Sequence, residues 1–241
     1  MTERPKIGML LDYESDGSFS RRPHYALRTG YFDAIWQAGG LPMGVPYVAD
    51  AIDDYLSSCS GFVFPGGFYA FPAAIYGQPD DPNEAIHPRY AFEKDLMKRV
   101  MKRDIPVLGI CAGMQVIASE RGGTMYRSIK SEVDTDFDHL NAQPAEQTAH
   151  GVTISRDTLL HRITGVETLQ VNTAHNEALK TVPDGLRVNA VADDGIIEGV
   201  EVPELRFCLG VQWHPEFFAT PGDANFNLFT ALVSAADGKD V

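Results

Sequence analysis

Through its first two thirds the chain alternates short apolar runs with amphipathic helical patterns, and this alternation limits the fold more than any other feature of the sequence. The apolar runs predict strands over residues 6–11, 41–45, 61–64 and 106–110. Helical spacing of apolar side chains predicts helices over residues 27–38, 51–56 and 92–101 and directly after Cys111. Strands separated by helices pair as parallel neighbours through crossover connections. We therefore expect an α/β fold with a mostly parallel central sheet flanked by helices.

The second half of the chain has a different pattern. Short strands are expected over residues 152–154, 168–172, 186–191, 196–202 and 207–213. Asp193-Asp194-Gly195 has the residue types of a tight hairpin turn, which indicates antiparallel pairing in this region. A last amphipathic helix is expected from Phe226 to Leu232. No repeat or linker interrupts the chain, and the polar stretch 78–87 is predicted to be a loop, so we expect a single domain over residues 1–241 with an antiparallel region in its second half.

Composition narrows the function classes. The chain has 241 residues, with 33 Asp and Glu against 20 Lys and Arg, so its net charge is −13. This balance argues against nucleic-acid binding and against a basic membrane-binding patch, because both need clustered cations. The apolar stretch at residues 7–11 is shorter than a secretory leader requires, and no window reaches the roughly 18 apolar residues of a membrane span. Because the three cysteines form no CxxC pair, we expect a cytoplasmic protein without a disulfide framework or a zinc ribbon.

One cysteine stands in a distinctive local pattern. In Gly109-Ile110-Cys111-Ala112-Gly113 a nucleophile lies between a predicted strand and a predicted helix, as in a nucleophile elbow. Glycines on both sides leave room for the tight turn, and the turn presents Cys111 at the carboxyl end of the sheet, where open α/β folds bind ligands. The positive end of the following helix favours a thiolate there. In isolation, a buried structural cysteine explains this motif about as well.

A histidine and a carboxylate follow the last predicted strand. In Gln212-Trp213-His214-Pro215-Glu216 the histidine and the glutamate are two residues apart, and positions i and i+2 at a strand end face the same side. Together they supply an imidazole base and a carboxylate that orients the ring, as a catalytic triad requires. A histidine near a strand end is on its own more often structural, but an elbow cysteine in the same chain reverses the odds.

A glycine turn follows the third predicted strand, in Phe64-Pro65-Gly66-Gly67. Its backbone N–H groups face the same crevice as the cysteine, and with the N–H of Ala112 they can form an oxyanion hole for acyl transfer. An ordinary strand-exit turn is the simpler interpretation of this motif in isolation.

Other chemistries have little support in the sequence. No P-loop occurs, and the histidines show neither HExxH nor another paired metal-ligand spacing, so no metal site and no cofactor are expected. Cys59 and Cys208 lie in apolar surroundings and are expected to be inert core thiols. The acidic pairs Asp80-Asp81 and Asp193-Asp194 are expected to be solvated turns. The seven histidines are His24, His87, His139, His150, His161, His175 and His214.

Three motifs together resemble the class I glutamine amidotransferase-like superfamily of Cys-His-Glu hydrolases: LGICAGMQ (108–115), VQWHPE (211–216) and FPGG (64–67). The similarity is closer to the γ-glutamyl hydrolase (peptidase C26) branch, and in particular to the γ-glutamyl-γ-aminobutyrate hydrolases of polyamine breakdown. The resemblance implies a flavodoxin-like fold and covers almost the whole chain. It also includes residues 38–46, 65–78, 122–123, 150–152, 171–175 and 194–199.

The resemblance implies roles for individual residues. Cys111 attacks the γ-carbonyl of a glutamyl amide to form a thioester, His214 protonates the leaving amine and then activates water, and Glu216 holds the histidine ring. Backbone N–H groups of Gly67 and Ala112 stabilise the oxyanion. A buried hydrogen-bonded histidine is the alternative for His175, and also for His150. The expected substrate-binding residues are Gly66, Gln115, Asn172, Thr173, Ala174 and His175. A homodimer and a small γ-glutamyl substrate are also implied.

The sequence departs from the family pattern at three places near the expected pocket. Ala112 stands where the family usually has Arg, Phe68-Tyr69 follow the glycine turn where an Asp is usual, and Asn-Glu-Ala follows His175. The aromatic run of Phe68, Tyr69, Phe71 and Tyr76 leads to the hypothesis of an apolar leaving-group side.

Three functions remain open on the sequence. The leading hypothesis is a free-standing hydrolase that releases glutamate from a small γ-glutamyl compound. The second is the glutaminase subunit of an amidotransferase, which supplies ammonia to a separate synthetase. The third is a non-catalytic binding protein on the same fold, an idea that the Ala112 departure keeps open.

Overall fold

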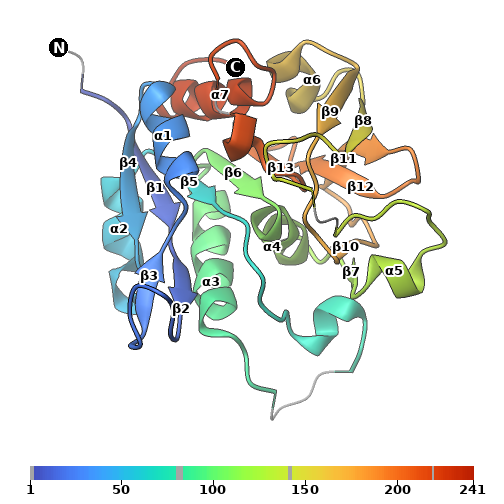
Figure 1. Ribbon diagram of the computed structural model, residues 1–241. Coiled ribbons are helices and arrows are strands. Elements are labelled where there is room, and N and C mark those ends of the chain that lie inside the picture. Colours follow the sequence, from blue (N-terminus) through green and yellow to red (C-terminus); the bar gives the residue numbers. More distant parts are fainter. Residues whose placement is uncertain (1–2, 80–83, 141–142, 219) are drawn as a thin grey trace.

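The computed structural model describes residues 3–79, 84–140, 143–218 and 220–241 (Figure 1). The strands are β1 Lys6–Leu10, β2 Asp12–Glu14, β3 His24–Ala26, β4 Leu41–Val45, β5 Gly61–Phe64, β6 Val107–Ile110, β7 Met125–Tyr126, β8 His150–Ile154, β9 Thr168–Val171, β10 Ala178–Leu179, β11 Arg187–Ala192, β12 Ile197–Glu201 and β13 Cys208–Val211. The α-helices are α1 Thr29–Gln37, α2 Ile52–Ser58, α3 Pro88–Lys102, α4 Ala112–Glu120, α5 Ile129–Glu132, α6 Leu159–Thr164 and α7 Phe226–Ala236. Short 3₁₀ helices cover Ala49–Ala51, Ala73–Tyr76 and Pro215–Phe218.

The central sheet is mixed, as predicted. Its parallel part has the order β4-β1-β5-β6-β13, and β12, β11, β8 and β9 continue it as antiparallel neighbours. Numbered along the chain, the five parallel strands have the order 2-1-3-4-5 of flavodoxin-like folds. The predicted hairpin turn joins β11 to β12, with Gly195 at a φ of 86°. The sequence thus predicted both the parallel part and the later antiparallel part. It placed the strand 207–213 in the antiparallel part, whereas β13 pairs in parallel with β6 on one edge and antiparallel with β12 on the other.

One register positions the site. β13 lies beside β6 in parallel, and Val211 is paired with Ile110. Since parallel strands end at the same edge of a sheet, the segments that follow these two residues leave the sheet side by side. Figure 1 shows α4 beginning directly after β6, close to the end of β13.

Helices cover both faces of the parallel strands, and a separate apolar core fills each side. Alternate residues of a strand enter opposite cores, so Ile7 and Met9 pack with α1 and α7, whereas Leu10 packs with α2, α3 and α4. All three side chains are fully buried. This two-sided burial explains why the parallel strands are nearly continuous apolar runs in the sequence.

The elements that the sequence did not predict are short. The hairpin β2–β3, the strands β7 and β10, and the helices α5 and α6 are each six residues or fewer, too short to show a clear period. Of the predicted loop 78–87, residues 80–83 lie outside the described residues, and so does the acidic pair Asp80-Asp81. Within the described ranges, no helix has both the length and the apolar character needed to cross a membrane.

Candidate active site

Cys111 occupies the strained turn that the sequence predicted. It lies between β6 and α4 with φ 51° and ψ −107°, a backbone conformation that side-chain-bearing residues rarely adopt. The flanking glycines are required by close packing. A Cβ on Gly113 would lie 2.0 Å from the carbonyl oxygen of Phe64, and one on Gly109 would lie 2.6 Å from the backbone of Gly113. The elbow therefore depends on glycine at both positions.

His214 and Glu216 form a buried pair, but a turn rather than strand alternation brings them together. The predicted strand 207–213 ends at Val211, and Glu216 lies in the 3₁₀ helix Pro215–Phe218. Pro215 has no N–H to continue a strand ladder, so the chain turns here instead. His214 Nδ1 lies 2.8 Å from Glu216 Oε1. The expected pairing is present, and the geometric reason given for it was wrong.

The side chain of Asn172 holds the backbone of His214. Its Oδ1 accepts the N–H of His214 at 2.8 Å, and its Nδ2 donates to the His214 carbonyl at 3.1 Å and to the carbonyl of Ala145 at 2.6 Å. Its amide is therefore fully engaged within the protein. The structure thus shows that Asn172 positions the histidine, and its predicted contact with substrate stays a prediction.

The electrostatics of the pair favour a charged imidazole. Burial by itself lowers the pKa of His214, but the Glu216 carboxylate and the Cys111 sulfur raise that pKa to about 10. Burial opposes ionisation of Glu216 as well, and His214, Arg28 and Tyr31 together hold its carboxyl pKa below the usual value. An imidazolium next to the sulfur is the arrangement that activates a cysteine as a nucleophile.

The glycine turn after β5 packs directly against these groups. A Cβ on Gly66 would lie 2.5 Å from His214 Cε1 and 3.3 Å from Cys111 Cβ, so only glycine fits there. The N–H of Gly66 donates to the Tyr31 hydroxyl at 3.1 Å. The N–H of Ala112 belongs to the first turn of α4, where the helix itself provides no acceptor.

Arg89 supports this turn, and sequence reasoning missed it. The side chain is fully buried, and its guanidinium donates to the carbonyls of Pro65 at 2.6 Å and Gly66 at 3.1 Å. It also donates to buried Glu93 at 2.9 Å and lies 3.0 Å from Asp12. In the sequence, Arg89 and Glu93 have the i,i+4 spacing of an ordinary surface pair, so no signal distinguished them.

Arg28 is a second residue that sequence reasoning missed. Its Nη2 donates to Glu216 Oε1 at 3.0 Å and to the Tyr31 hydroxyl at 3.2 Å. About half of its side chain is exposed, which places a cation at the boundary between the buried triad and an open cavity.

Two cavities meet at Cys111. The larger has a volume of about 610 Å³ and the smaller about 120 Å³, and Cys111, Gly67 and Phe68 line both. Of the remaining predicted site residues, Ala112 and Glu216 are in the lining of neither cavity, and the others divide between the two. The larger cavity is lined by Gly66, Asn172, Thr173, Ala174 and His214, and the smaller by Gln115 and His175.

The smaller cavity is lined by polar groups that could bind a polar part of a ligand. Gln115 Nε2 donates to Gln212 Oε1 at 3.2 Å and to the carbonyl of Glu177 at 3.3 Å. The Glu177 carboxylate accepts a hydrogen bond from Tyr76 at 2.6 Å, and burial raises the pKa of this carboxyl. Glu177 is the Glu of Asn-Glu-Ala, where the sequence departs from the family pattern. This departure was the feature of the sequence that could have identified Glu177 as a site residue.

The four aromatic residues of the run do not line one cavity together, and the apolar leaving-group side stays a hypothesis. Phe68 is 77% exposed and lines both cavities, whereas Tyr69 lines only the smaller one. Phe71 is buried in the core against Tyr90. Tyr76 is in the lining of neither cavity, and its hydroxyl donates a hydrogen bond to the Glu177 carboxylate.

The other two cysteines are buried and free. Burial raises the pKa of Cys59 and raises that of Cys208 to about 12. Both are therefore poor nucleophiles, as expected for core thiols.

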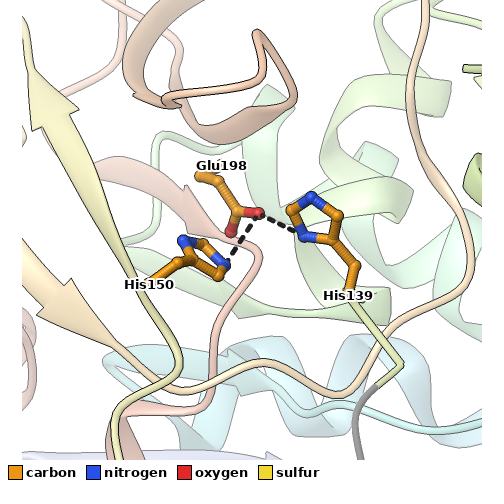
Figure 2. A group of neighbouring side chains, drawn as sticks. All are labelled: His139, His150 and Glu198. Carbon is orange, nitrogen blue, oxygen red and sulfur yellow. Dashed lines mark ion pairs between the residues drawn. The ribbon is translucent and has the colours of Figure 1, made fainter. Parts of the chain in front are cut away.

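A second cluster of titratable groups lies around Glu198. The spacing of the histidines along the chain predicted no metal site, yet folding brings His139, His150 and His175 to this one carboxylate. Figure 2 shows His139 and His150 pointing toward Glu198. His175 is the member that also lines the smaller cavity.

The fold and this arrangement at the carboxyl end of the parallel strands define a class, the class I glutamine amidotransferase fold. The glutaminase domain of Trypanosoma brucei CTPS, solved with bound acivicin, superimposes with a TM-score of 0.66 at 21% identity and covers 98% of this chain and 95% of its own. Residues 5–216 match the Peptidase C26 family, and the chain belongs to that family of glutamine amidotransferase-like hydrolases.

Two curated relatives share most of their length with the chain. A glutamine amidotransferase-like protein of Rickettsia prowazekii is 31% identical over 98% of this chain and 99% of its own length. The γ-glutamyl-γ-aminobutyrate hydrolase PuuD of Escherichia coli K12 is 29% identical over 87% of this chain and 85% of its own.

Proposed function

We propose that the protein hydrolyses the γ-glutamyl amide bond of a small γ-glutamyl compound, similar to γ-glutamyl-GABA, and releases glutamate and an amine. One observation carries this proposal: the sulfur of a strained elbow cysteine, Cys111, lies between two cavities and beside the buried His214–Glu216 pair. A substrate with two halves joined by an amide bond can place one half in each cavity.

The reaction proceeds through a thioester. The Cys111 sulfur attacks the γ-carbonyl carbon, the C–N bond breaks, and His214 transfers its proton to the leaving amine. His214 then removes a proton from water, the water oxygen attacks the thioester, and the C–S bond breaks to release glutamate and restore the cysteine. The N–H groups of Gly67 and Ala112 stabilise the oxyanion in both steps, and one such donor contributes about 10²–10³ in kcat.

The chemistry of each cavity favours one orientation of the substrate. The smaller cavity, with Gln115 and the Glu177 carboxylate, suits the zwitterionic glutamyl half, and the carboxylate faces its ammonium group. The larger cavity then holds the amine half. Among the described residues that line it, Arg28 is the one Lys or Arg side chain, which favours an amine carrying a carboxylate, as GABA does.

The test is glutamate release from a panel of substrates, with Cys111→Ala as the control. The panel contains γ-glutamyl-GABA, γ-glutamyl polyamines, γ-glutamyl aromatic amines, a folyl polyglutamate and glutamine. We expect turnover of γ-glutamyl-GABA or a similar carboxylate-bearing compound, and its loss in the control. Turnover of glutamine only when a synthetase partner is added, or tight binding without turnover, would contradict the proposal.

A further inference from the structure

Four buried side chains direct their polar atoms at one another in the Glu198 cluster. Glu198 Oε1 lies 3.2 Å from His175 Nε2, 3.4 Å from His139 Nδ1 and 3.7 Å from His150 Nε2. None of these four side chains is more than a few per cent exposed. Within the part of the chain that the structure describes, these three nitrogens and both Glu198 oxygens have no hydrogen-bond partner.

The second nitrogen of each histidine ring determines where its proton lies. His175 Nδ1 is 2.9 Å from the carbonyl of Glu177, and His150 Nδ1 is 3.2 Å from the carbonyl of Gly151. His139 Nε2 is 2.9 Å from an Asp194 carboxylate oxygen.

All three of these partners only accept hydrogen bonds, so each of these nitrogens carries the N–H. In the neutral rings, the three nitrogens that face Glu198 therefore present lone pairs. Three lone pairs then converge on a carboxylate, an arrangement that requires a cation.

Protonation of the histidines does not satisfy all the polar atoms of this cluster. Protonating one histidine satisfies one contact and leaves the other two lone pairs facing the same oxygen. Protonating all three would bury a net positive charge, which is costly in the interior. A divalent cation satisfies all the acceptors at once.

We propose that His139, His150 and Glu198 bind one divalent transition-metal ion of the zinc type; the Nε2 of His175 lies 3.2 Å from the same Glu198 oxygen. The ligand atoms of the first three residues all lie within 4.8 Å of one another. Two ligands about 2.0–2.1 Å from a tetrahedral ion are roughly 3.3–3.4 Å apart, and the Glu198 oxygen lies 3.4 Å from His139 Nδ1 and 3.7 Å from His150 Nε2. Imidazole nitrogen favours zinc-like ions over Mg²⁺ and Ca²⁺, which prefer oxygen ligands.

The surroundings also match a metal site. Metal-binding histidines usually donate their other N–H to a backbone carbonyl or a carboxylate, as all three histidines do here. Asp194 is itself held by the Thr135 hydroxyl at 2.7 Å. Such contacts fix the ring orientations before an ion binds.

The ion's place in the fold gives it a positioning role. The N–H of His175 and the hydroxyl of Thr173 donate to the carbonyl of His139 at 2.9 and 2.8 Å. A metal that joins His139 to β8 and β12 therefore orders the segment that carries Thr173 and His175. This segment lines both cavities at Cys111, so the ion supports the pocket without taking part in the reaction.

The experiment is a metal titration of the full chain in a Cys111→Ala background, which removes the cysteine thiol of the candidate active site as a competing ligand. After treatment with a chelator, the protein is titrated with Zn²⁺ by calorimetry and with Co²⁺ by visible absorption. We expect one ion per chain, tetrahedral Co²⁺ bands and a higher Tm. Glu198→Gln and His150→Gln should each weaken binding by about 100-fold or more, and His161→Gln, which changes a histidine outside the cluster, should leave binding unchanged.

Two outcomes would overturn the proposal: a folded parent protein that binds neither ion at one equivalent, or binding that survives in Glu198→Gln. Circular dichroism of each variant shows whether it is folded. Should a variant not fold, the parent protein still decides the matter through its stoichiometry, its Co²⁺ spectrum and its Tm shift. All these readouts are independent of hydrolase activity.

Discussion

Arg89 provides a demanding test, because one buried side chain supports both the fold and the turn beside the nucleophile. In Arg89→Met, the buried Glu93 carboxylate loses its ion partner at 2.9 Å. Removing one member of a buried ion pair costs about 3–5 kcal/mol of stability. The carbonyls of Pro65 and Gly66 lose charge-assisted hydrogen bonds, which are worth about 1.5–3 kcal/mol each. We therefore expect a large fall in the free energy of unfolding.

Activity should fall for a separate reason. Pro65 and Gly66 lead into Gly67, whose N–H is the proposed oxyanion donor. Losing such a donor lowers kcat by about 10²–10³. Adding Glu93→Gln to Arg89→Met removes the unpaired buried charge, so this double variant should recover much of the stability and none of the kcat.

The assays are urea unfolding at constant m-value and glutamate release on the substrate selected from the panel. Arg99→Met is the matched control, because Arg99 lies on the same helix and has an i,i+4 carboxylate partner, Asp95, but is exposed. This control should change neither quantity measurably. Wild-type stability in Arg89→Met, or recovery of kcat in the double variant, would refute the reasoning.

Three further changes test the site. Gly66→Ala should lower kcat by about 10²-fold or more, because its Cβ would lie 2.5 Å from His214 Cε1 and displace the ring; an unchanged kcat in the glutamate-release assay would contradict the close packing. Arg28→Gln should raise KM for amines that carry a carboxylate more than for uncharged amines; an equal change in kcat/KM for both kinds would exclude Arg28 as the specificity residue. Because the pKa of His214 rises from 6.5 to about 10 on folding, its protonated ring stabilises the fold fully below about pH 6.5, and this contribution is lost as the pH rises toward 10. The free energy of unfolding, measured across that pH range, should decline less in His214→Gln than in the wild type. An equal decline in both proteins would show that His214 does not cause the pH dependence of stability.

Much of the molecule follows from patterns that neighbouring residues create. The parallel strands were predicted because both faces of each strand are buried, which leaves a continuous apolar run in the sequence. The elbow was predicted because its geometry requires glycine on each side of Cys111, and both glycines are close to it in the chain. These features depend on local periodicity and local backbone sterics, so they can be read without knowledge of long-range contacts.

Long-range contacts decided the rest. Arg89 and Arg99 lie on one helix, and each has a carboxylate four residues away, yet one is in the core and the other at the surface. Only the position of the glycine turn against α3 distinguishes them.

The Glu198 cluster shows the same principle. His139, His150 and His175 come from segments that are separate in the chain. The pairing of β8 and β12 through β11 brings His150 to Glu198, whereas His139 and His175 lie outside these strands and are joined by the hydrogen bond from the His175 N–H to the His139 carbonyl. The spacing of ligand residues along a sequence reveals a metal site only when one local motif supplies the ligands. A site that a sheet assembles from distant segments leaves no such spacing, because the fold alone fixes the distances between its atoms.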